Sequence, residues 1–164
     1  MDLNTRPPSM EPEVLGQSST MQNLASAFAR EAETLVRYRQ FAKTARHEGF
    51  GDAAELFDRL AENQEVIVHG HLDFLRDWAD PLTHLPLGTT PENVQAALAA
   101  ELQDARDIYP AFSRAADAEP SPLVASWFTT LALAKDSNAR RIQSSLKETA
   151  ASEGAIVSLP STGN

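Results

Sequence analysis

Four long segments of this chain place apolar residues three and four positions apart, the spacing of one face of an α-helix. Gly49 is a natural stop for the first segment, and a Thr-Pro and a Ser-Pro pair open the third and fourth. No alternating pattern predicts a strand. The sequence therefore predicts an all-α chain with helices over residues 20–48, 52–78, 90–118 and 121–147.

The second pair of segments repeats the first. An offset of 70 residues carries the apolar stripe of the first segment onto the third, so that Ala42 and Ala45 correspond to Phe112 and Ala115. An offset of 71 carries the second segment onto the fourth, and Phe57, Leu60 and Ala61 recur as Phe128, Leu131 and Ala132. Such a period predicts a duplicated helical hairpin, and hence a four-helix bundle built from two hairpins.

The connection between the two hairpins is long. It covers residues 77–90 and, fully extended, reaches about 46 Å. A helix of about 29 residues is roughly 43 Å long. The connection can therefore cross the whole bundle, or it can let two subunits exchange hairpins, and we expect a homodimer.

Composition excludes several classes of protein. The chain has 14 basic and 23 acidic residues, a net charge of −9, and no cysteine. Nucleic acid and anionic membranes are therefore poor partners, and disulfides, iron–sulfur clusters and Cys-ligated metals are excluded. No apolar run approaches the ~20 residues that span a bilayer, and no leader pattern precedes Glu13, so we expect a cytoplasmic protein.

Polar residues interrupt the apolar stripes at one level of the predicted bundle. Counted from the hairpin turns at ~1.5 Å per residue, most of them lie within about one helical turn of mid-height. A carboxylate there must be neutralised, hydrogen-bonded or metal-bound, because desolvating a bare ion is unfavourable. The residues of this layer are Glu31, Gln64, His71, Glu101, Lys135 and Asn138.

Two motifs resemble the rubrerythrin branch of the ferritin-like superfamily. The first is Ala-Phe-Ala-x-Glu followed seven residues later by Tyr, over residues 27–38. The second is Glu101 with an acid three residues on and Tyr109-Pro110 eight residues on. The resemblance covers residues 20–146 and implies two irons in the core, held by one Glu from the first and third helices and a Glu-x-x-His pair from the second and fourth.

Some of the ligands that this resemblance implies are present. Glu31 and Glu101 match the two single glutamates, and Asp104 matches a further acid of rubrerythrins. Tyr38 and Tyr109 match hydroxyls that hydrogen-bond the ligand carboxylates. These five residues are the ones that the family pattern carries over.

The Glu-x-x-His pairs are missing. Gln64 and Ile67 stand in place of the first pair, and Lys135 and Asn138 in place of the second. An ammonium beside the glutamates would supply the countercharge of a metal, and the two amides can donate to the same oxygens. The sequence thus predicts a metal-free polar core in which an ion pair bridges the hairpins.

A weak metal site is the alternative that the same residues allow. If Lys135 turned out to solvent, Glu31, Glu101 and Asp104 could hold iron or manganese, with His71 recruited as a displaced ligand. His71 is otherwise a hydrogen-bonded core histidine. The Cys-ligated single-iron module of full-length rubrerythrins cannot be formed by a sequence without cysteine.

Three functions follow from these alternatives. The first is a structural or partner-binding protein without catalysis, and the second an iron-dependent oxidase or peroxidase with an altered site. The third rests on the apolar residues 155–159, which resemble the short tails that dock cargo inside encapsulin shells. Residues 1–19 and 148–164, rich in Pro, Gly, Ser and Thr, are expected to be flexible arms around one domain over residues 20–147.

Overall fold

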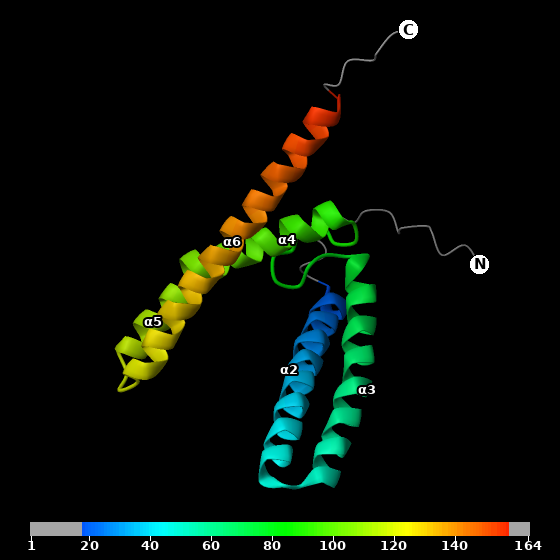
Figure 1. Cartoon of the computed structure of the whole chain (residues 1–164), viewed down its shortest axis with the longest axis vertical. Coiled ribbons are helices and arrows are strands. Elements are labelled where there is room, and N and C mark those ends of the chain that lie inside the picture. The colour runs from blue at the N-terminus through cyan, green and yellow to red at the C-terminus, as the bar shows by residue number, and fades with distance from the viewer. Residues whose placement is uncertain (1–17, 158–164) are drawn as a thin grey trace, which may run out of the picture. The chain divides into compact units, whose positions relative to one another are not determined.

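The computed structural model describes residues 18–157, and the side chains of residues 18–147. These residues form helices and turns and contain no strand, which confirms the all-α prediction (Figure 1). The elements are α2 (Ser19–Glu48), α3 (Gly51–Arg76), α4 (Thr90–Gln103), the π-helix η1 (Asp104–Ile108), α5 (Tyr109–Asp117) and α6 (Pro122–Val157).

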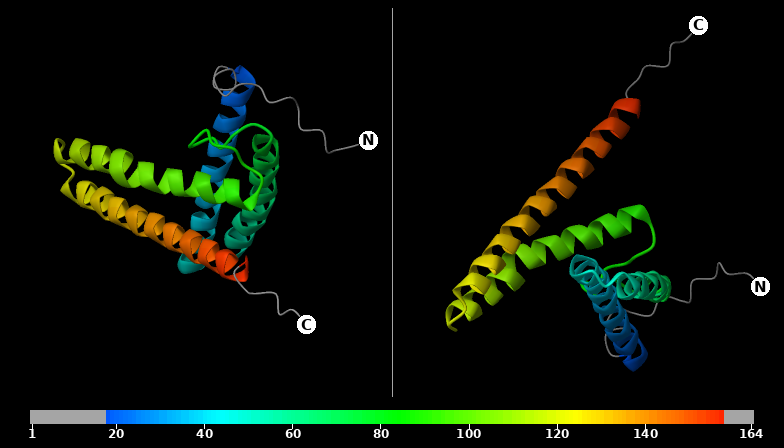
Figure 2. Two further views of the ribbon diagram at one scale, coloured as in Figure 1. Left: turned by 90° about the horizontal axis from the view of Figure 1, so that it is seen from above. Right: turned by 60° about the horizontal axis from the view of Figure 1, so that its bottom comes forward.

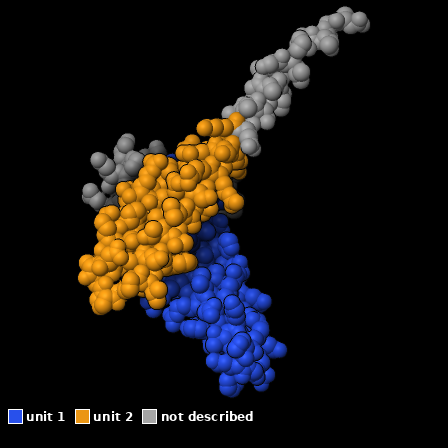
Figure 3. All heavy atoms as spheres, turned by 60° about the vertical axis from the view of Figure 1, so that its left-hand side comes forward, with its two compact units in different colours: residues 1–89 blue, residues 90–164 orange. Residues whose placement is uncertain are grey.

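The chain divides into two compact units, residues 1–89 and 90–164 (Figure 3). In the first unit α2 and α3 form an antiparallel hairpin, and in the second the continuous rod α4–η1–α5 pairs with α6 (Figure 2). In each hairpin one long helical segment is followed by a turn and a second helix that runs back along it. This pairing is consistent with a four-helix bundle and with the predicted repeat.

The turn of the first hairpin is built on Gly49. Its φ of 85° is left-handed, and the Phe50 N–H donates to Ala45 O at 2.8 Å, which closes the end of α2. Helix α3 begins at Gly51, one residue before the predicted start at residue 52. The Ala54 N–H already donates to Phe50 O at 3.0 Å, so α3 begins at Gly51 without a side-chain cap.

Buried residues, most of them alanines, line the seam of each hairpin. Along α3, Ala54, Ala61, Val68 and Leu75 are buried at intervals of seven residues. Along α6, Ala125 and Ala139 are buried at the positions that an offset of 71 predicts. A seven-residue period is typical of coiled-coil packing, and small side chains let the helix axes approach closely.

The offset between the hairpins changes within η1. Before it, Glu101 corresponds to Glu31, an offset of 70. After it, the buried pair Ser113 and Ala116 corresponds to buried Ala42 and Ala45, an offset of 71. The predicted correspondence of Phe112 and Ala115 is therefore wrong, because the wider turn of a π-helix accommodates one additional residue.

The aromatic side chains confirm this reading of the offset. Tyr38 and Phe41 pack on Phe57 with ring centroids 6.2 and 5.4 Å apart. Their counterparts at an offset of 71, Tyr109 and Phe112, pack on Phe128 at 6.1 and 5.5 Å. The two hairpins are thus in the same register on both sides of η1.

Two segments differ in length from the prediction. Helix α3 ends at Arg76, followed by one tight turn, and α6 runs to Val157, ten residues past the expected end. Residues 1–17 and 158–164 lie outside the described residues, as do the side chains of the tail segment 155–159.

No helix in the described part of the chain is both long and apolar enough to cross a membrane.

Deleting Arg106, an exposed residue of η1, tests whether the π-turn is a one-residue insertion. We expect η1 to become α-helical with both seams still in register, and the free energy of unfolding to change by only about 1 kcal/mol. The matched control is deletion of exposed Val36 in α2, where no π-turn can be removed. That deletion rotates the seam by about 100° and should cost more than about 4 kcal/mol. Urea unfolding followed by circular dichroism measures both, and equal losses would contradict the insertion.

Candidate polar site in the helical hairpins

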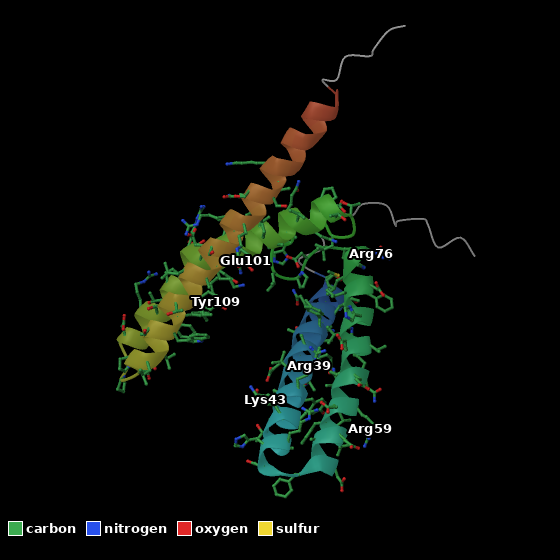
Figure 4. The ribbon with its side chains drawn as sticks, in the orientation of Figure 1. Arg39, Lys43, Arg59, Arg76, Glu101 and Tyr109 are labelled. Carbon is green, nitrogen blue, oxygen red and sulfur yellow. The ribbon has the colours of Figure 1, made fainter. Side chains whose placement is uncertain are left out.

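The site of the second hairpin centres on the ammonium of Lys135. Its Nζ lies 3.2 Å from Glu101 Oε1 and 3.1 Å from Asp104 Oδ2. The side chains of Lys135, Glu101 and Asp104 are 27, 20 and 29% exposed. The cation therefore points to the helix that carries the acids, and not into bulk water. Figure 4 labels Glu101 on α4, with Tyr109 further along the same rod.

The two acids keep Lys135 charged. Burial by itself lowers the pKa of Lys135, but hydrogen bonds from Lys135 to Asp104 and Glu101, with the attraction of both carboxylates, raise that pKa above its usual 10.5. The ammonium is consequently the dominant form at neutral pH.

A second donor completes the environment of Glu101. Asn138, one helical turn after Lys135, donates from Nδ2 to Glu101 Oε2 at 3.1 Å. Both oxygens of this carboxylate thus have a partner on α6. The structure brings together four of the residues singled out in the sequence, Glu101, Asp104, Lys135 and Asn138.

The first hairpin repeats this contact with a neutral donor. Gln64 is buried on α3 and donates from Nε2 to Glu31 Oε2 on α2. Gln64 corresponds to Lys135 and Glu31 to Glu101. Each hairpin therefore carries one glutamate that accepts hydrogen bonds from its own partner helix. The donor is one amide in the first hairpin, and an ammonium with an amide in the second.

Asp104 has no acidic counterpart in the first hairpin. It is the first residue of η1 and lies three positions after Glu101, so both acids share one helix face. The corresponding residue, Thr34, donates instead to Arg30 O at 2.9 Å within its own helix. The additional acid is thus present only in the hairpin that has the lysine.

The tyrosines pack beside the polar residues. Tyr38 contacts Phe57, and Tyr109 contacts Phe112 and Phe128. Among the described residues neither hydroxyl donates to one of the site carboxylates. Their part in the polar network therefore remains a prediction.

His71 lies about 10 Å along α3 from Gln64, the residue that contacts Glu31. It is half-buried on α3, two turns beyond Gln64. Across residues 18–147, no three His, Asp or Glu side chains come together in a group that could hold a metal.

Sequence reasoning missed three features. Two ion pairs cross the first hairpin, Arg39 to Glu65 at 2.8 Å and Arg46 to Asp58. In the second hairpin, buried Ser113 donates to Ala125 O at 3.1 Å. The sequence shows the arginines and the acids, but it does not show which arginine pairs with which acid across the hairpin. Ser113, the buried polar residue of the seam, was missed because the predicted offset of 70 placed Phe112 at its position.

The donors at this site do not fit a dinuclear metal. A protonated lysine has no lone pair to offer, and an amide nitrogen is a donor rather than a ligand. In the described hairpins these groups already occupy oxygens of Glu31 and Glu101. The geometry instead suits a closed set of charge-assisted hydrogen bonds.

Comparison with known proteins identifies the relatives of this chain. The rubrerythrin family model matches residues 22–134. Rubrerythrin of Porphyromonas gingivalis is 33% identical over 128 residues, which are 76% of this chain and 64% of that protein. Rubrerythrin-1 of Clostridium acetobutylicum is 30% identical over 141 residues, with coverages of 79 and 71%. Nigerythrin of Nitratidesulfovibrio vulgaris is 31% identical over 130 residues, with coverages of 75 and 63%. The chain thus spans less than two thirds of the first and the last.

Replacing the ammonium tests how far it stabilises the second hairpin. Lys135→Met should lower the free energy of unfolding at pH 7 by about 1–2 kcal/mol, because two carboxylates lose a charged partner. Lys43→Met is the control, since Lys43 is exposed on α2 and should change stability little. Chemical denaturation of both variants gives the comparison, and equal effects would show that the ion pairs contribute nothing.

The pH dependence of this difference follows from the raised pKa of Lys135. A group whose pKa is higher in the folded state contributes its full stabilisation at pH values below its unfolded pKa, which is about 10.4 for lysine. This contribution is lost as the pH rises through the folded-state pKa. The stability gap between wild type and Lys135→Met should therefore be constant from pH 7 to about 9.5 and shrink above about 10.5. Denaturation series at matched ionic strength measure the gap. A gap that grows with alkaline pH would contradict the assigned ion pairs.

Proposed function

The chain belongs to the rubrerythrin family, and we propose that it is a member in which a fixed polar core replaces the dinuclear iron site. In this proposal it serves a structural or partner-binding role and not iron-dependent catalysis. The observation that supports it most directly is the placement of Lys135 between Glu101 and Asp104.

A cation held on the protein competes with a metal for the same oxygens. Binding a divalent ion at Glu101 and Asp104 would require Lys135 to leave or to lose its proton. Both are unfavourable, since its pKa is raised by the acids it contacts. Coulomb repulsion between the ammonium and the metal adds to this barrier.

The amides support the same conclusion. In a ferritin-like iron site the second and fourth helices each supply Glu-x-x-His. Here Gln64 and Asn138 direct their amide nitrogens at Glu31 and Glu101. An Ile at position 67 offers no ligand atom. Of the expected set, the two single glutamates are retained, and both already accept hydrogen bonds from protein donors.

The arrangement proposed for the intact bundle follows from the repeat. Glu31 with Gln64, and Glu101 with Lys135 and Asn138, would form one polar layer shared by the two hairpins. The excess charge of that layer, three carboxylates against one ammonium, would be offset by amide hydrogen bonds.

Restoring the family's ligands tests this proposal. Metal-depleted wild type incubated with Fe(II) should retain far less than one equivalent of iron per chain after gel filtration. The variant Gln64→Glu, Ile67→His, Lys135→Glu, Asn138→His should retain up to about two equivalents, because the full ligand set is then present. Elemental analysis measures the iron.

The control carries substitutions of the same types at exposed positions, Lys147→Glu and Asn63→His, and should bind like wild type. Two equivalents in the wild type would contradict the proposal. Peroxide consumption by the iron-treated wild type that disappears in Glu31→Ala would establish the oxidase or peroxidase alternative, with Glu31, Glu101 and Asp104 as ligands.

A further inference from the structure

One face of α6 is uncharged and exposed along its first turns. Its large residues, Leu123, Trp127 and Leu133, are 85, 58 and 66% exposed. Smaller exposed residues of the same side of the helix lie between them. We call this surface the outer face of α6, and its residues are Leu123, Ser126, Trp127, Thr130, Leu133 and Ala134. Exposed apolar side chains that gather on one face are typical of an interaction surface, whereas isolated ones are not.

Packing inside a four-helix bundle does not use this face. At about 100° per residue, Thr130 lies roughly 140° around the helix from Ala125 and 160° from Phe128. Ala125 is buried in the seam between α6 and the rod α4–η1–α5. Phe128 belongs to the apolar stripe, the side that a second hairpin covers in such a bundle. The outer face is therefore available to another molecule.

The first hairpin shows that the fold does not require an uncharged face here. Helix α3 holds the same place in its hairpin, and an offset of 71 relates the two helices. Four of the six corresponding residues of α3 are charged, as expected for a surface in contact with water. These six residues are Asp52, Glu55, Leu56, Arg59, Glu62 and Asn63. The lack of charge is thus specific to α6.

The outer face is complementary to itself when two copies of α6 lie antiparallel about a twofold axis at Thr130. Residues at the same level then have numbers that sum to about 260. Trp127 of one copy lies against Ala134 of the second copy, and Leu133 lies against Ser126 of the second copy. Each large side chain meets a small one, so the helix axes can approach to about 8–10 Å.

Charges at the ends of the face favour a second copy as the partner. In the same register, Arg141 of one copy reaches the level of Glu119 of the second copy, in the turn before α6. Both residues are exposed, and the twofold axis repeats the pair. Over the rest of the surface, two copies with a net charge of −9 each repel one another. At the outer face they can meet without bringing like charges together.

We propose that the outer face of α6 joins two copies of this chain through an antiparallel, twofold helix pair. From Leu123 to Arg141 the contact is about 27 Å long. A contact of one helix pair belongs to the small interfaces, below about 1,200 Å² in total, which are typical of weak association. Its population therefore depends on protein concentration. The contact forms with or without iron in the polar core, because it uses none of the residues of that core.

A single cysteine on the twofold axis tests this arrangement. The chain has no cysteine of its own, so a disulfide can form only at the introduced position. In Thr130→Cys the two Cα atoms come within about 4–6 Å, the distance that a disulfide needs. Mild oxidation of the folded chain should give a linked pair of twice 17.8 kDa on a non-reducing gel.

Arg59→Cys is the matched control, since Arg59 is the exposed counterpart of Thr130 on α3. Its yield of linked pairs should be at least about tenfold lower, because no contact raises the effective concentration of its thiol. Equal yields from the two variants, or no linked pair from Thr130→Cys, would overturn the proposal.

Light scattering over a range of protein concentrations measures the contact without a covalent link. The average mass of the wild type should rise with concentration. Leu133→Lys should raise the dissociation constant by about tenfold or more, because an ammonium would lose water against the second copy. Val66→Lys, at a 73% exposed apolar residue of α3, should leave that constant unchanged.

A charge exchange checks the register. Arg141→Glu should weaken the contact by about threefold, and adding Glu119→Arg should restore it. A wild-type mass independent of concentration would overturn the proposal, and this is the result expected if the face binds a different protein. Equal effects of Leu133→Lys and Val66→Lys would also overturn it, and failure of the exchange to restore association would contradict the antiparallel register.

Discussion

The need to compensate partly buried carboxylates governs the described structure of this protein. Glu101 and Asp104 lie on one helix face with less than a third of each side chain exposed, and the ammonium of Lys135 lies within 3.2 Å of both. Without a cation there, two like charges at this spacing would repel each other in a medium that screens them poorly. In the function proposed for this chain, the lysine would meet from within the chain a requirement that a ferritin-like iron site meets with metal ions.

Both hairpins provide a hydrogen-bond donor to a partly buried glutamate, but this donor is neutral in the first hairpin and charged in the second. Gln64 neutralises no charge on Glu31 but supplies a hydrogen bond to it, while Lys135 supplies both to Glu101. The additional acid, Asp104, occurs only in the hairpin that has the stronger donor. Donor strength and acid content therefore vary together, so that each hairpin keeps one carboxylate charge that its donor does not neutralise.

Much of the fold could be predicted from the sequence because it depends on periodicity and on a few special residues. The spacing of apolar residues identified the helices, and Gly49 identified a turn that needs a left-handed residue. The polar site of each hairpin could be located because Glu31, Gln64, Glu101 and Lys135 occupy stripe positions. Their contacts inside each hairpin then follow from the helix spacing.

Features that depend on hydrogen-bond geometry could not be predicted in this way. A π-turn shifts the following residues of the helix by one position. Apolar residues that are already spaced three and four positions apart do not reveal this shift in the sequence. The turn in which the Asp80 carboxylate accepts from the Thr83 N–H and hydroxyl lies in a segment whose composition suggests only a loop. The start of α3 is set by the hydrogen bond from the Ala54 N–H to the Phe50 carbonyl and not by a side-chain cap.

The change of offset inside η1 also bears on the origin of the sequence repeat. Two copies of one ancestral hairpin begin with the same number of residues between any two landmarks. Here the distance from Glu31 to Tyr38 is one residue shorter than the distance from Glu101 to Tyr109. If the repeat arose by duplication of one hairpin, a residue was gained or lost afterwards in one copy only. An alignment of the two halves therefore needs a one-residue gap in the first half, opposite residues 104–108.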